Sequence, residues 1–573
     1  MNLVGALAAV AARGTGRGIR LFRGGAEAER LPFDELHLDA GRLACGLLER
    51  GVTAGERVAI TLPTSTDFAR AFFGVLAAGA VPVPLPAPQR FAPLDVYVRR
   101  TALALRQSRI TRILADRALT GVLEPLLADA GGEFTVLDVA CCSAASPVYT
   151  EAAGDDPALV QYTSGTGSDP RGVLLSHANL LANTAAIGKG LGVTDADVCC
   201  SWLPLFHDMG LIGTFLSAVF SGIDTILQPP EDFLRDPGRW LGIIAGQRVT
   251  ITSAPNSGYL HALRRTPAER VRELDLSAWR LALNGAEAVD PGLLRRFSAH
   301  FAPAGFRPTA FLPVYGLAEG TLAVTFPPLD RPVRTVRVRR DLLGEGVVSL
   351  LDESAAAEGA REVASVGFPV AGTEVRLVGA DGPVPAERPA LGEIQIRGDS
   401  VTAGYEHHEA ATRAVVHEGG WVSTGDLGFR HDGELYIVGR TKEMVIVFGR
   451  NHYAGDIESI AAAVPEVAGG GVLAAAVPSP EGERLVLFVE TAATAAEARE
   501  HLVGQVRQAV SGALGVTPHE VVLLRKGRLP RTSSGKLVRY GSEDLHRQYG
   551  TPDPLTPPGA PGPPGAPGAA TPG

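Results

Sequence analysis

Short runs rich in Val, Ile and Leu alternate with longer Ala- and Leu-rich helical patterns from about residue 30 to residue 440. RVAITLP at 57–63 and AVPVPL at 80–85 have the composition of buried strands, and the stretch 66–78 between them has the spacing of a helix. Such alternation predicts parallel sheets that are covered by helices. We therefore expect an α/β protein whose large N-terminal domain is built from stacked α/β sheets.

The pattern changes near residue 370, where the sequence becomes typical of antiparallel β structure. Asp-Gly pairs at 381–382 and 432–433 each lie between strand-like runs. Asp-Gly is a preferred turn of two-residue hairpins, so we expect a β-rich subdomain at the end of the large domain.

A smaller α+β segment follows residue 440. The runs 486–493 and 520–526 have strand character, and 494–514 between them has helical character, with Thr494 and Glu497 at capping-box spacing. We predict three parts: an N-terminal domain over 1–439, a small mobile C-terminal domain over 440–550, and a disordered Pro- and Gly-rich tail over 551–573.

Composition disfavours several classes of protein. A chain of 573 residues is too long for one hydrophobic core. Its 53 Lys and Arg against 62 Asp and Glu give a net charge of −9, which argues against a dedicated nucleic-acid binder. The apolar start, with Leu3, Leu7 and Val10 on one helical face, has no basic residue before it and so differs from a signal peptide. No apolar run reaches the roughly 18 residues of a membrane span, so we expect a cytoplasmic protein.

Residues 163–172, TSGTGSDPRG, combine three glycines with hydroxyl side chains and an arginine directly after a strand-like run. Converging backbone N–H groups and hydroxyls bind phosphate, and glycine lets the anion approach the backbone. The order fits neither GxxxxGK[ST] nor GxGxxG, and such a loop is also common as a plain connection. Its interpretation depends on the rest of the chain.

Three further segments carry polar groups among apolar ones. His207 and Asp208 interrupt the apolar run 202–215, either as a core histidine with its partner or as a polar head at the mouth of an apolar cavity. The runs 281–290 and 312–322 each pass from a strand-like stretch to Gly and Glu. Open α/β sheets bind ligands at the carboxyl ends of their strands, so both runs are candidate ligand sites.

Isolated functional groups follow later in the chain. Tyr315 can stack on a base, and Glu319 can bind Mg²⁺ through its carboxylate. Asp426 stands before a hairpin, and its carboxylate can bind the vicinal hydroxyls of a ribose. Arg440 lies at the predicted domain boundary. Lys536 lies in a loop rich in Ser and Gly. Taken singly, such acids and lysines are usually solvated surface.

The order of these segments resembles the adenylate-forming superfamily of acyl-CoA synthetases, luciferases and peptide-synthetase adenylation domains, over about residues 3 to 545. Within it the chain is most similar to the fatty acyl-AMP ligases. The stretches that carry this similarity are WLPLFHDMGLIG, SAPNSGY, LDLSAWRLALNGAEAV, FRPTAFLPVYGLAEGTL and GRNHYAGDIE. An added stretch at about 333–361 resembles the insertion that marks these ligases and disfavours CoA.

The resemblance implies a reaction in two halves. A carboxylic acid, in most of these ligases a fatty acid, attacks the α-phosphorus of ATP and gives acyl-AMP and pyrophosphate, with Mg²⁺ as the metal cofactor. The small domain then rotates, and the phosphopantetheine thiol of an acyl carrier protein or a polyketide or peptide synthetase takes the acyl group. The alternatives are an acyl-CoA ligase, and a weakly active or inactive adenylate-binding partner in a biosynthetic complex.

The resemblance also implies roles for individual residues. Lys536 would bridge the carboxylate and the α-phosphate, His207 would lie near the carboxylate, Glu319 would bind Mg²⁺, and Lys442 matches the hinge. The acyl pocket would include His207, Asp208, Ser257 and Gly258. The ATP- and AMP-binding set would be Thr163, Ser164, Gly165, Thr166, Gly167, Arg171, Asn284, Gly285, Ala286, Glu287, Tyr315, Gly316, Leu317, Ala318, Asp426 and Arg440.

Two stretches depart from the family's wording. Its phosphate loop usually reads TSGSTGxPKG, whereas this chain has TSGTGSDPRG, so a glycine moves by one position and Arg171 replaces lysine. We therefore expect altered binding of the ATP phosphates and a slower first half-reaction. Ser257 and Gly258 stand where the ligases tend to carry Phe-Ala, which predicts a wider or rerouted acyl pocket.

Overall fold

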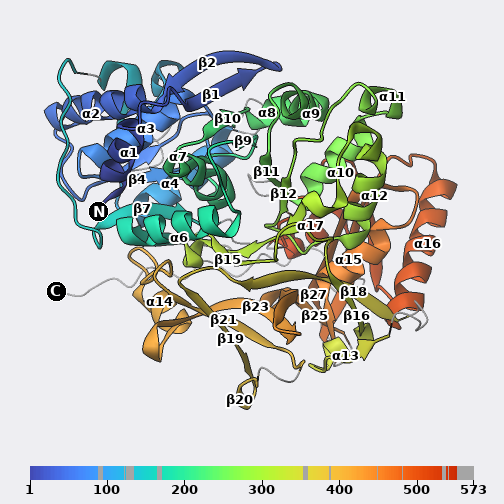
Figure 1. The fold of residues 1–573 in the computed structure, drawn as a ribbon. Helices are drawn as coiled ribbons and strands as arrows, with labels where there is room; N and C mark the ends of the chain where they lie inside the picture. The colour runs from blue at the N-terminus through green and yellow to red at the C-terminus, as the bar shows by residue number, and fades with distance from the viewer. Residues whose placement is uncertain are drawn as a thin grey trace, which may run out of the picture. The chain divides into compact units, whose positions relative to one another are not determined.

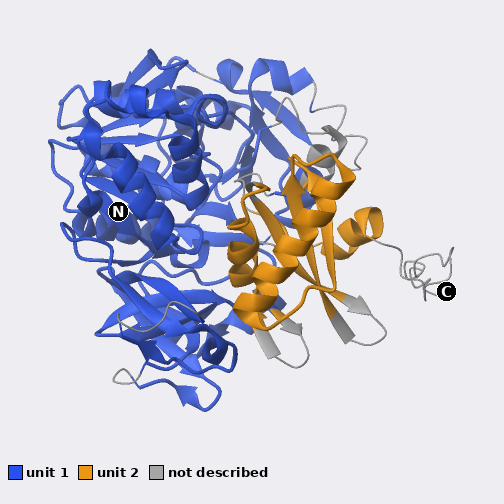
Figure 2. Cartoon of the chain, turned by 90° about the vertical axis from the view of Figure 1, so that its right-hand side faces the viewer, with its two compact units in different colours: residues 1–444, 531–536 blue, residues 445–530, 537–573 orange. Residues whose placement is uncertain are grey.

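The chain divides into two compact units, unit 1 over residues 1–444 and 531–536 and unit 2 over residues 445–530 and 537–573 (Figure 2). The predicted boundary at 440 stays a prediction, and the predicted tail lies outside the described residues. The computed structural model describes residues 1–87, 94–121, 123, 134–142, 144–163, 171–352, 359–385, 389–447, 450–479, 482–531, 537–539 and 541–550.

A seven-stranded sheet is the larger of the two parallel sheets in unit 1 (Figure 1). All neighbours pair in parallel except β1 and β2, which form an antiparallel hairpin at one edge. The carboxyl ends of the parallel strands therefore meet at one edge of the sheet. The strand order is β13 (Phe311–Pro313), β12 (Leu281–Asn284), β11 (Ile251–Ala254), β9 (Val198–Ser201), β10 (Asp224–Leu227), β1 (Gly18–Arg23), β2 (Ala26–Pro32).

The second parallel sheet has four strands, in the order β4 (Val81–Pro84), β3 (Arg57–Ile60), β5 (Arg112–Ala115), β6 (Thr135–Asp138). It contains the strands predicted within 57–63 and 80–85, and the helix predicted at 66–78 is α3 (Thr66–Ala77). A separate antiparallel pair is formed by β7 (Pro157–Tyr162) and β8 (Gly172–Ser176).

Helices pack against both parallel sheets (Figure 1). Leu3, Leu7 and Val10 are buried on one face of α1, as their spacing predicts, and Asp290 caps α12 by accepting from Leu293 N at 3.0 Å. None of the helices within the described ranges is long and apolar enough to cross a membrane. The helices of unit 1 are α1 (Leu3–Ala11), α2 (Phe33–Glu49), α3, α4 (Leu94–Gln107), α6 (His177–Gly190), α7 (Ser217–Ser221), α8 (Pro230–Arg235), α9 (Pro237–Gly246), α10 (Asn256–Arg265), α11 (Ala268–Val271), α12 (Pro291–Phe301), α13 (Arg340–Gly344) and α14 (Glu409–Val415).

An antiparallel sheet forms the β-rich part of unit 1 and begins earlier than predicted. Antiparallel pairing starts with β14 at Tyr315, directly after the parallel strand β13, rather than near residue 370. The sequence does not mark this start because a short helical turn, and not an Asp-Gly hairpin, joins β14 to β15. The main path is β14 (Tyr315–Gly316), β15 (Ala323–Phe326), β18 (Ala360–Pro369), β24 (Glu434–Arg440), β23 (Trp421–His431), β21 (Gly392–Gly398), β19 (Thr373–Gly379), β20 (Gly382–Pro383).

The predicted hairpins and the predicted insertion both belong to this sheet. Asp432 and Gly433 connect β23 to β24 with φ of 50° and 79°, the positive values that a type I′ turn requires. Beside the main path lie β16 (Thr335–Arg339), β17 (Leu350–Leu351) and β22 (Val416–His417). Because β16 pairs with β17 and β18, the described strands of the stretch 333–361 extend the sheet.

Unit 2 has a three-stranded sheet in the order β27 (Val467–Ser479), β28 (Gly482–Thr491), β29 (Glu520–Arg525). The strands predicted at 486–493 and 520–526 are confirmed. The helix α16 (Ala496–Leu514) starts later than predicted, and its N-cap is Ala495 without a side-chain hydrogen bond, so the predicted capping box of Thr494 and Glu497 is wrong. The pair β25 (Met444–Val447) and β26 (Arg450–Tyr453), α15 (Ala454–Ala462) and α17 (Ser542–Tyr549) complete the described elements near and in this unit.

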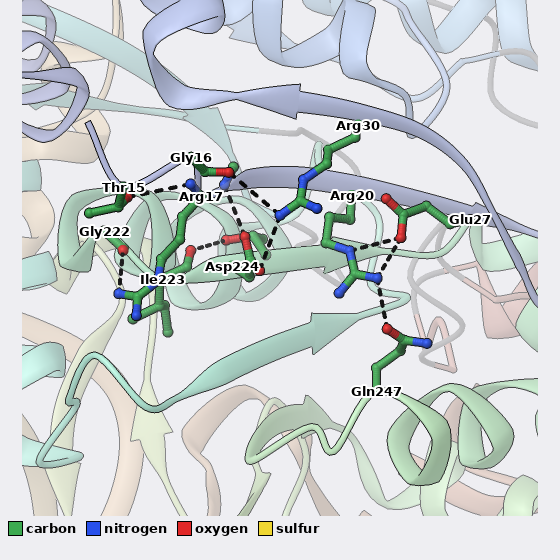
Figure 3. A network of polar contacts seen from close by, with 12 residues as sticks. Thr15, Gly16, Arg17, Arg20, Glu27, Arg30, Gly222, Ile223, Asp224 and Gln247 are labelled. Carbon is green, nitrogen blue, oxygen red and sulfur yellow. Dashed lines mark hydrogen bonds and ion pairs between the residues drawn. The ribbon is translucent and has the colours of Figure 1, made fainter. Parts of the chain in front are cut away.

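Arg17 and Arg30 connect the hairpin of β1 and β2 to residues at the start of β10 (Figure 3). Gly18 N donates to Asp224 Oδ1 at 3.0 Å, and Arg30 Nη2 lies 3.7 Å from Asp224 Oδ2. Arg17 Nη1 donates to Gly222 O at 3.4 Å. These contacts support the pairing of β1 with β10, which joins the hairpin to the parallel sheet at the end of the strand order away from β12.

Candidate active site

The candidate phosphate loop is closed at its base by a backbone hydrogen bond. Thr163 N donates to Arg171 O at 3.0 Å, and the adjacent strand residues Tyr162 and Gly172 are register partners. The hairpin of β7 and β8 therefore holds the two ends of the loop together. Residues 164–170, which include the predicted Ser164, Gly165, Thr166 and Gly167, lie outside the described residues.

Arg171 packs on an aromatic residue that the sequence analysis did not select. Its guanidinium carbon lies 5.3 Å from the centroid of the Tyr405 ring, within the range of a cation–π interaction. Tyr405 Oη in turn donates to Glu319 Oε1 at 2.7 Å. One continuous set of contacts thus joins the exit of the loop to the carboxylate predicted to bind Mg²⁺.

Glu319 lies in the helical turn η5 (Ala318–Gly320) between β14 and β15. Desolvation is the largest influence on its carboxyl and raises the pKa, against the hydrogen bond from Tyr405. Arg440 and Asp426 also act on this carboxyl electrostatically, in opposite directions, so both charges lie near it. A desolvated carboxylate in this setting gains strongly from a bound cation.

Tyr315, Asp426 and Arg440 form one hydrogen-bonded cluster. Arg440 Nε donates to Asp426 Oδ1 at 2.8 Å, and Tyr315 Oη donates to Oδ2 at 2.7 Å. Asp426 and Arg440 are register partners on β23 and β24. Burial raises the pKa of the Tyr315 phenol, which therefore remains a donor. Because a carboxylate offers about four acceptor positions, Asp426 retains capacity for the hydroxyls of a ligand.

Asn284 ends β12 at the carboxyl edge of the parallel sheet and is fully buried. Neither Oδ1 nor Nδ2 of its amide has a hydrogen-bond partner among the described residues. A buried polar group left unpaired costs roughly 1–3 kcal/mol, so this position suits the polar group of a ligand. The neighbouring Ala286 has φ of 67°, a strained conformation for a residue with a side chain.

The rest of this turn is closely packed. A side chain at Gly285 would place its Cβ 2.8 Å from Val314 Cγ2, so the position requires glycine. Glu287 accepts from Ser257 through both the backbone N and Oγ at 3.3 Å. The predicted nucleotide residue Glu287 and the predicted pocket residue Ser257 are therefore in contact.

Gly316, Leu317 and Ala318 shape the backbone between Tyr315 and Glu319. Leu317 N donates to Leu322 O at 2.9 Å, and a Cβ at Gly316 would overlap the same carbonyl. Leu317 and Ala318 are buried. The three residues fix how far apart the tyrosine and the carboxylate lie, through their backbone and apolar packing.

His207 and Asp208 lie between β9 and η2 (Met209–Leu216), a π-helix, which is a form that often occurs at functional sites. His207 Nδ1 lies 2.7 Å from Asp208 Oδ1, so the histidine does have a carboxylate partner. Gln161 Nε2 donates to Phe206 O at 2.8 Å. This bond ties the hairpin that carries the phosphate loop to the His207 segment.

Gly258 lies against an indole ring. A Cβ at this position would approach Trp202 Cζ2 at 2.7 Å, and the Trp202 ring stacks on Phe233 with centroids 3.8 Å apart. The space beside Gly258 is therefore occupied by Trp202. Ser257, in contrast, is exposed and bonded to Glu287.

Two predicted lysines stand, along the sequence, close to positions where the chain passes from one unit to the other. Lys442 is exposed in η7 (Thr441–Glu443), two residues before the division at 444. Lys536 lies outside the described residues. The hinge and catalytic roles of these lysines stay predictions.

Seven of the predicted residues that the structure describes fall into three sets of contacts. These are Arg171 with Glu319 through Tyr405, Asp426 with Tyr315 and Arg440, and Glu287 with Ser257. Tyr405 was missed because it stands in an irregular segment, and no periodicity or motif spacing marks it.

Known protein families and structures were compared with this chain. The family model described as AMP-binding enzyme matches residues 9–406, and the model described as AMP-binding enzyme C-terminal domain matches residues 456–536. The first of these matches covers more than half of the chain.

Relatives and solved structures agree with this match. The medium-chain-fatty-acid–[acyl-carrier-protein] ligase JamA of Moorena producens is 34% identical over 535 residues, 91% of this chain and 90% of that protein. The long-chain-fatty-acid–AMP ligase FadD26 of Mycobacterium marinum is 35% identical over 554 residues, 91% and 92% of the two chains. A structure from a study of fatty acyl-adenylate ligases of E. coli and L. pneumophila superposes with a TM-score of 0.88 at 31% identity, over 96% of this chain and 98% of the other.

Proposed function

Because this chain belongs to the AMP-binding enzyme family and is a fatty acyl-AMP ligase of the adenylate-forming superfamily, we propose that its three sets of site contacts divide the reaction among them. The enzyme uses ATP to convert a carboxylic acid to acyl-AMP and then transfers the acyl group to a carrier. The single observation that supports the site assignment is the buried cluster of Asp426 with Tyr315 and Arg440, in which both charged groups act electrostatically on the Glu319 carboxyl.

In the first half-reaction we assign the residues by charge. A carboxylate oxygen of the acid bonds to the α-phosphorus of ATP, and the bond from that phosphorus to the bridging oxygen breaks to release pyrophosphate. Two anions must meet, so the site has to neutralise charge and align the attack. Thr163 to Gly167 and Arg171 would hold the leaving phosphates, and Lys536 would contact both the acid and the α-phosphate.

The nucleoside would be held from two sides. Asp426 would accept hydrogen bonds from the ribose hydroxyls, held in place by Tyr315 and Arg440. The adenine would lie by the turn from Asn284 to Glu287, where the buried Asn284 amide can pair with its polar edge. The unpartnered atoms of Asn284 and the strained Ala286 support this placement.

Mg²⁺ fits the site because it commonly binds one or two carboxylates together with substrate phosphates. Glu319 supplies one such carboxylate, with Oε1 bonded to Tyr405. When bound, the ion spreads the charge that develops on the phosphates. We propose Glu319 as its protein ligand.

In the second half-reaction a thiol sulfur attacks the acyl carbonyl carbon, the thiol loses its proton, and AMP leaves. We propose a fatty acid as the substrate and the phosphopantetheine arm of an acyl carrier protein or synthetase as the acceptor. JamA is named as an acyl-carrier-protein ligase, which supports this acceptor. We also propose two domains, at 1–439 and 440–550, that rotate relative to each other about Lys442. A cytoplasmic location is part of the same proposal.

ATP–pyrophosphate exchange with a panel of acids from medium to long chain tests the first half. We expect exchange with at least one acid and none without acid. Folded enzyme that shows no exchange with any acid would instead be an inactive adenylate-binding protein.

The second half-reaction is tested by offering the enzyme, with ATP and acid, either a holo-carrier protein or CoA. Mass spectrometry measures the acylated carrier, and a separate assay measures acyl-CoA. Preferential formation of acyl-CoA would assign a CoA ligase.

A further inference from the structure

Tyr405 contacts two parts of the site that come from distant stretches of the chain. Its Oη donates to Glu319 Oε1 at 2.7 Å, and its ring lies under the Arg171 guanidinium at 5.3 Å. The hydroxyl donates to the carboxylate, and the arginine interacts with both the ring and the hydroxyl. A single side chain therefore connects the end of the phosphate loop with the proposed metal ligand.

The backbone around Tyr405 is fixed to the same two parts. Glu406 N donates to Gly172 O at 2.8 Å, and Leu174 N donates to Gly404 O at 3.1 Å, so the segment pairs with β8 through one isolated antiparallel bridge between Val173 and Tyr405. Thr402 N donates to the carbonyl of Glu319 at 2.8 Å. The segment 402–406 consequently has little freedom to move relative to either the loop exit or η5.

The Tyr405 hydroxyl also restricts the rotation of the Glu319 carboxylate. Oε1 accepts from Tyr405, so Oε2 is the oxygen that this hydrogen bond does not occupy. Mg²⁺ demands near-ideal octahedral geometry, and carboxylate ligands are commonly oriented by their own hydrogen-bond partners. A carboxylate that could rotate freely would meet this demand less often.

We propose that Tyr405 is a positioning residue that orients Glu319 for Mg²⁺ and couples this orientation to Arg171 at the phosphate loop. The inference rests on the proposed function, in which Glu319 binds Mg²⁺. It extends that function by naming a residue that touches neither the reacting atoms nor the ion. Because Tyr405 contacts both Arg171 and Glu319, the metal ligand and the loop exit move together.

The substitution Tyr405→Phe tests this role, since it keeps the ring under Arg171 and removes only the hydroxyl. We expect the Mg²⁺ concentration for half-maximal ATP–pyrophosphate exchange to rise about tenfold, with the rate at saturating Mg²⁺ changed much less. The matched control is Tyr149→Phe, whose hydroxyl donates to His37 O at 3.0 Å at an exposed site. That variant should keep the wild-type Mg²⁺ dependence. A melting curve of Tyr405→Phe should stay cooperative and shift by no more than the loss of one hydrogen bond would cause.

A double-mutant cycle separates positioning from general disturbance. Once Glu319→Gln is present, adding Tyr405→Phe should change the Mg²⁺ dependence little, whereas independent effects would add. Additive effects, or an unchanged Mg²⁺ dependence in Tyr405→Phe, would overturn the inference.

Binding of Mn²⁺ in the presence of ATP, followed by electron paramagnetic resonance, gives a second readout that needs no turnover. Weaker Mn²⁺ binding by Tyr405→Phe supports the inference, and equal binding overturns it. Wild-type enzyme without exchange activity would refute the proposed function while this binding comparison still decides the role of Tyr405.

Discussion

Tyr315 and Asp426 lie 111 positions apart in the chain, yet the tyrosine hydroxyl donates to the aspartate at 2.7 Å in a buried cluster. Replacing Tyr315 by Phe keeps the ring and removes this donor. The loss of one hydrogen bond costs about 1 kcal/mol, so we expect the KM for ATP to rise roughly fivefold with little change in kcat. Steady-state kinetics at saturating acid would measure this. Tyr436→Phe, on β24 with its ring stacked on Phe429, is the control and should leave the KM unchanged.

Lys536 should matter for one half-reaction only. Removing a group that stabilises the charge of a transition state typically costs about 100- to 1,000-fold in rate, so Lys536→Ala should slow exchange by that factor. Transfer from chemically prepared acyl-AMP to a holo-carrier protein should be affected far less. Lys526→Ala, at an exposed lysine of unit 2, is the control. Equal losses in both half-reactions would contradict the assigned role.

The order of residues in the phosphate loop should limit the first half-reaction. The triple change Thr166→Ser, Gly167→Thr and Ser168→Gly restores the order that is usual in the family. Because glycine is the residue that adopts positive φ without strain, we expect its return to the family's usual position to make exchange faster. An unchanged rate would mean that this chain tolerates its own order.

Gly258→Ala should strain the contact with Trp202. The added Cβ would lie 2.7 Å from Trp202 Cζ2, and the ring is already stacked on Phe233. Overpacking of this kind costs about 1–3 kcal/mol, which chemical denaturation followed by fluorescence would detect. Gly242→Ala, on α9 with open space around it, should be neutral or slightly stabilising.

The buried His177 should make stability depend on pH. Burial lowers its pKa from 6.5 to about 4 in the folded chain, and Nδ1 accepts from Leu3 N at 3.2 Å. A lowered pKa means that the unfolded chain binds the proton more readily, so this contribution is complete above pH 6.5 and is lost as pH falls toward 4. Between pH 7.5 and pH 5 it amounts to about 2 kcal/mol.

Urea denaturation of wild type and His177→Gln at these two pH values tests this expectation. The substitution cannot titrate, so the difference between pH 7.5 and pH 5 should shrink by about 2 kcal/mol. An identical difference in the two proteins would show that the pKa of His177 is the same in the folded and the unfolded chain, and would contradict the expectation.

The regular parts of the fold could be predicted because local patterns determine them. The helix α3, the hairpin at Asp432-Gly433 and the cap of α12 by Asp290 follow from spacing and turn chemistry alone. The capping box at Thr494 failed because α16 begins two residues later than its sequence pattern suggests. The antiparallel turn after Tyr315 escaped notice because its geometry depends on packing against Leu322 rather than on a turn dipeptide.

The sequence could predict those site residues that stand in motifs shared with the family. Asp426, Arg440 and Glu319 come from such motifs, and the structure places them close together. Tyr405 and the contact between Gly258 and Trp202 depend on residues far apart in the chain. Pairings of this kind are settled only when the tertiary structure brings the two stretches together.

Arg57, at the start of β3, donates through Nε to Glu406 at 2.8 Å across 349 positions, and the Glu406 side chain is only 3% exposed. At roughly 5–20 residues per second of synthesis, Arg57 is made on the order of 20–70 s before its partner. All strands of the four-stranded sheet, the last of which ends at Asp138, are therefore synthesised long before the segment 402–406 that pairs with β8. A nascent chain that stalls before residue 406 lacks the carboxylate that the Arg57 guanidinium binds in the finished protein.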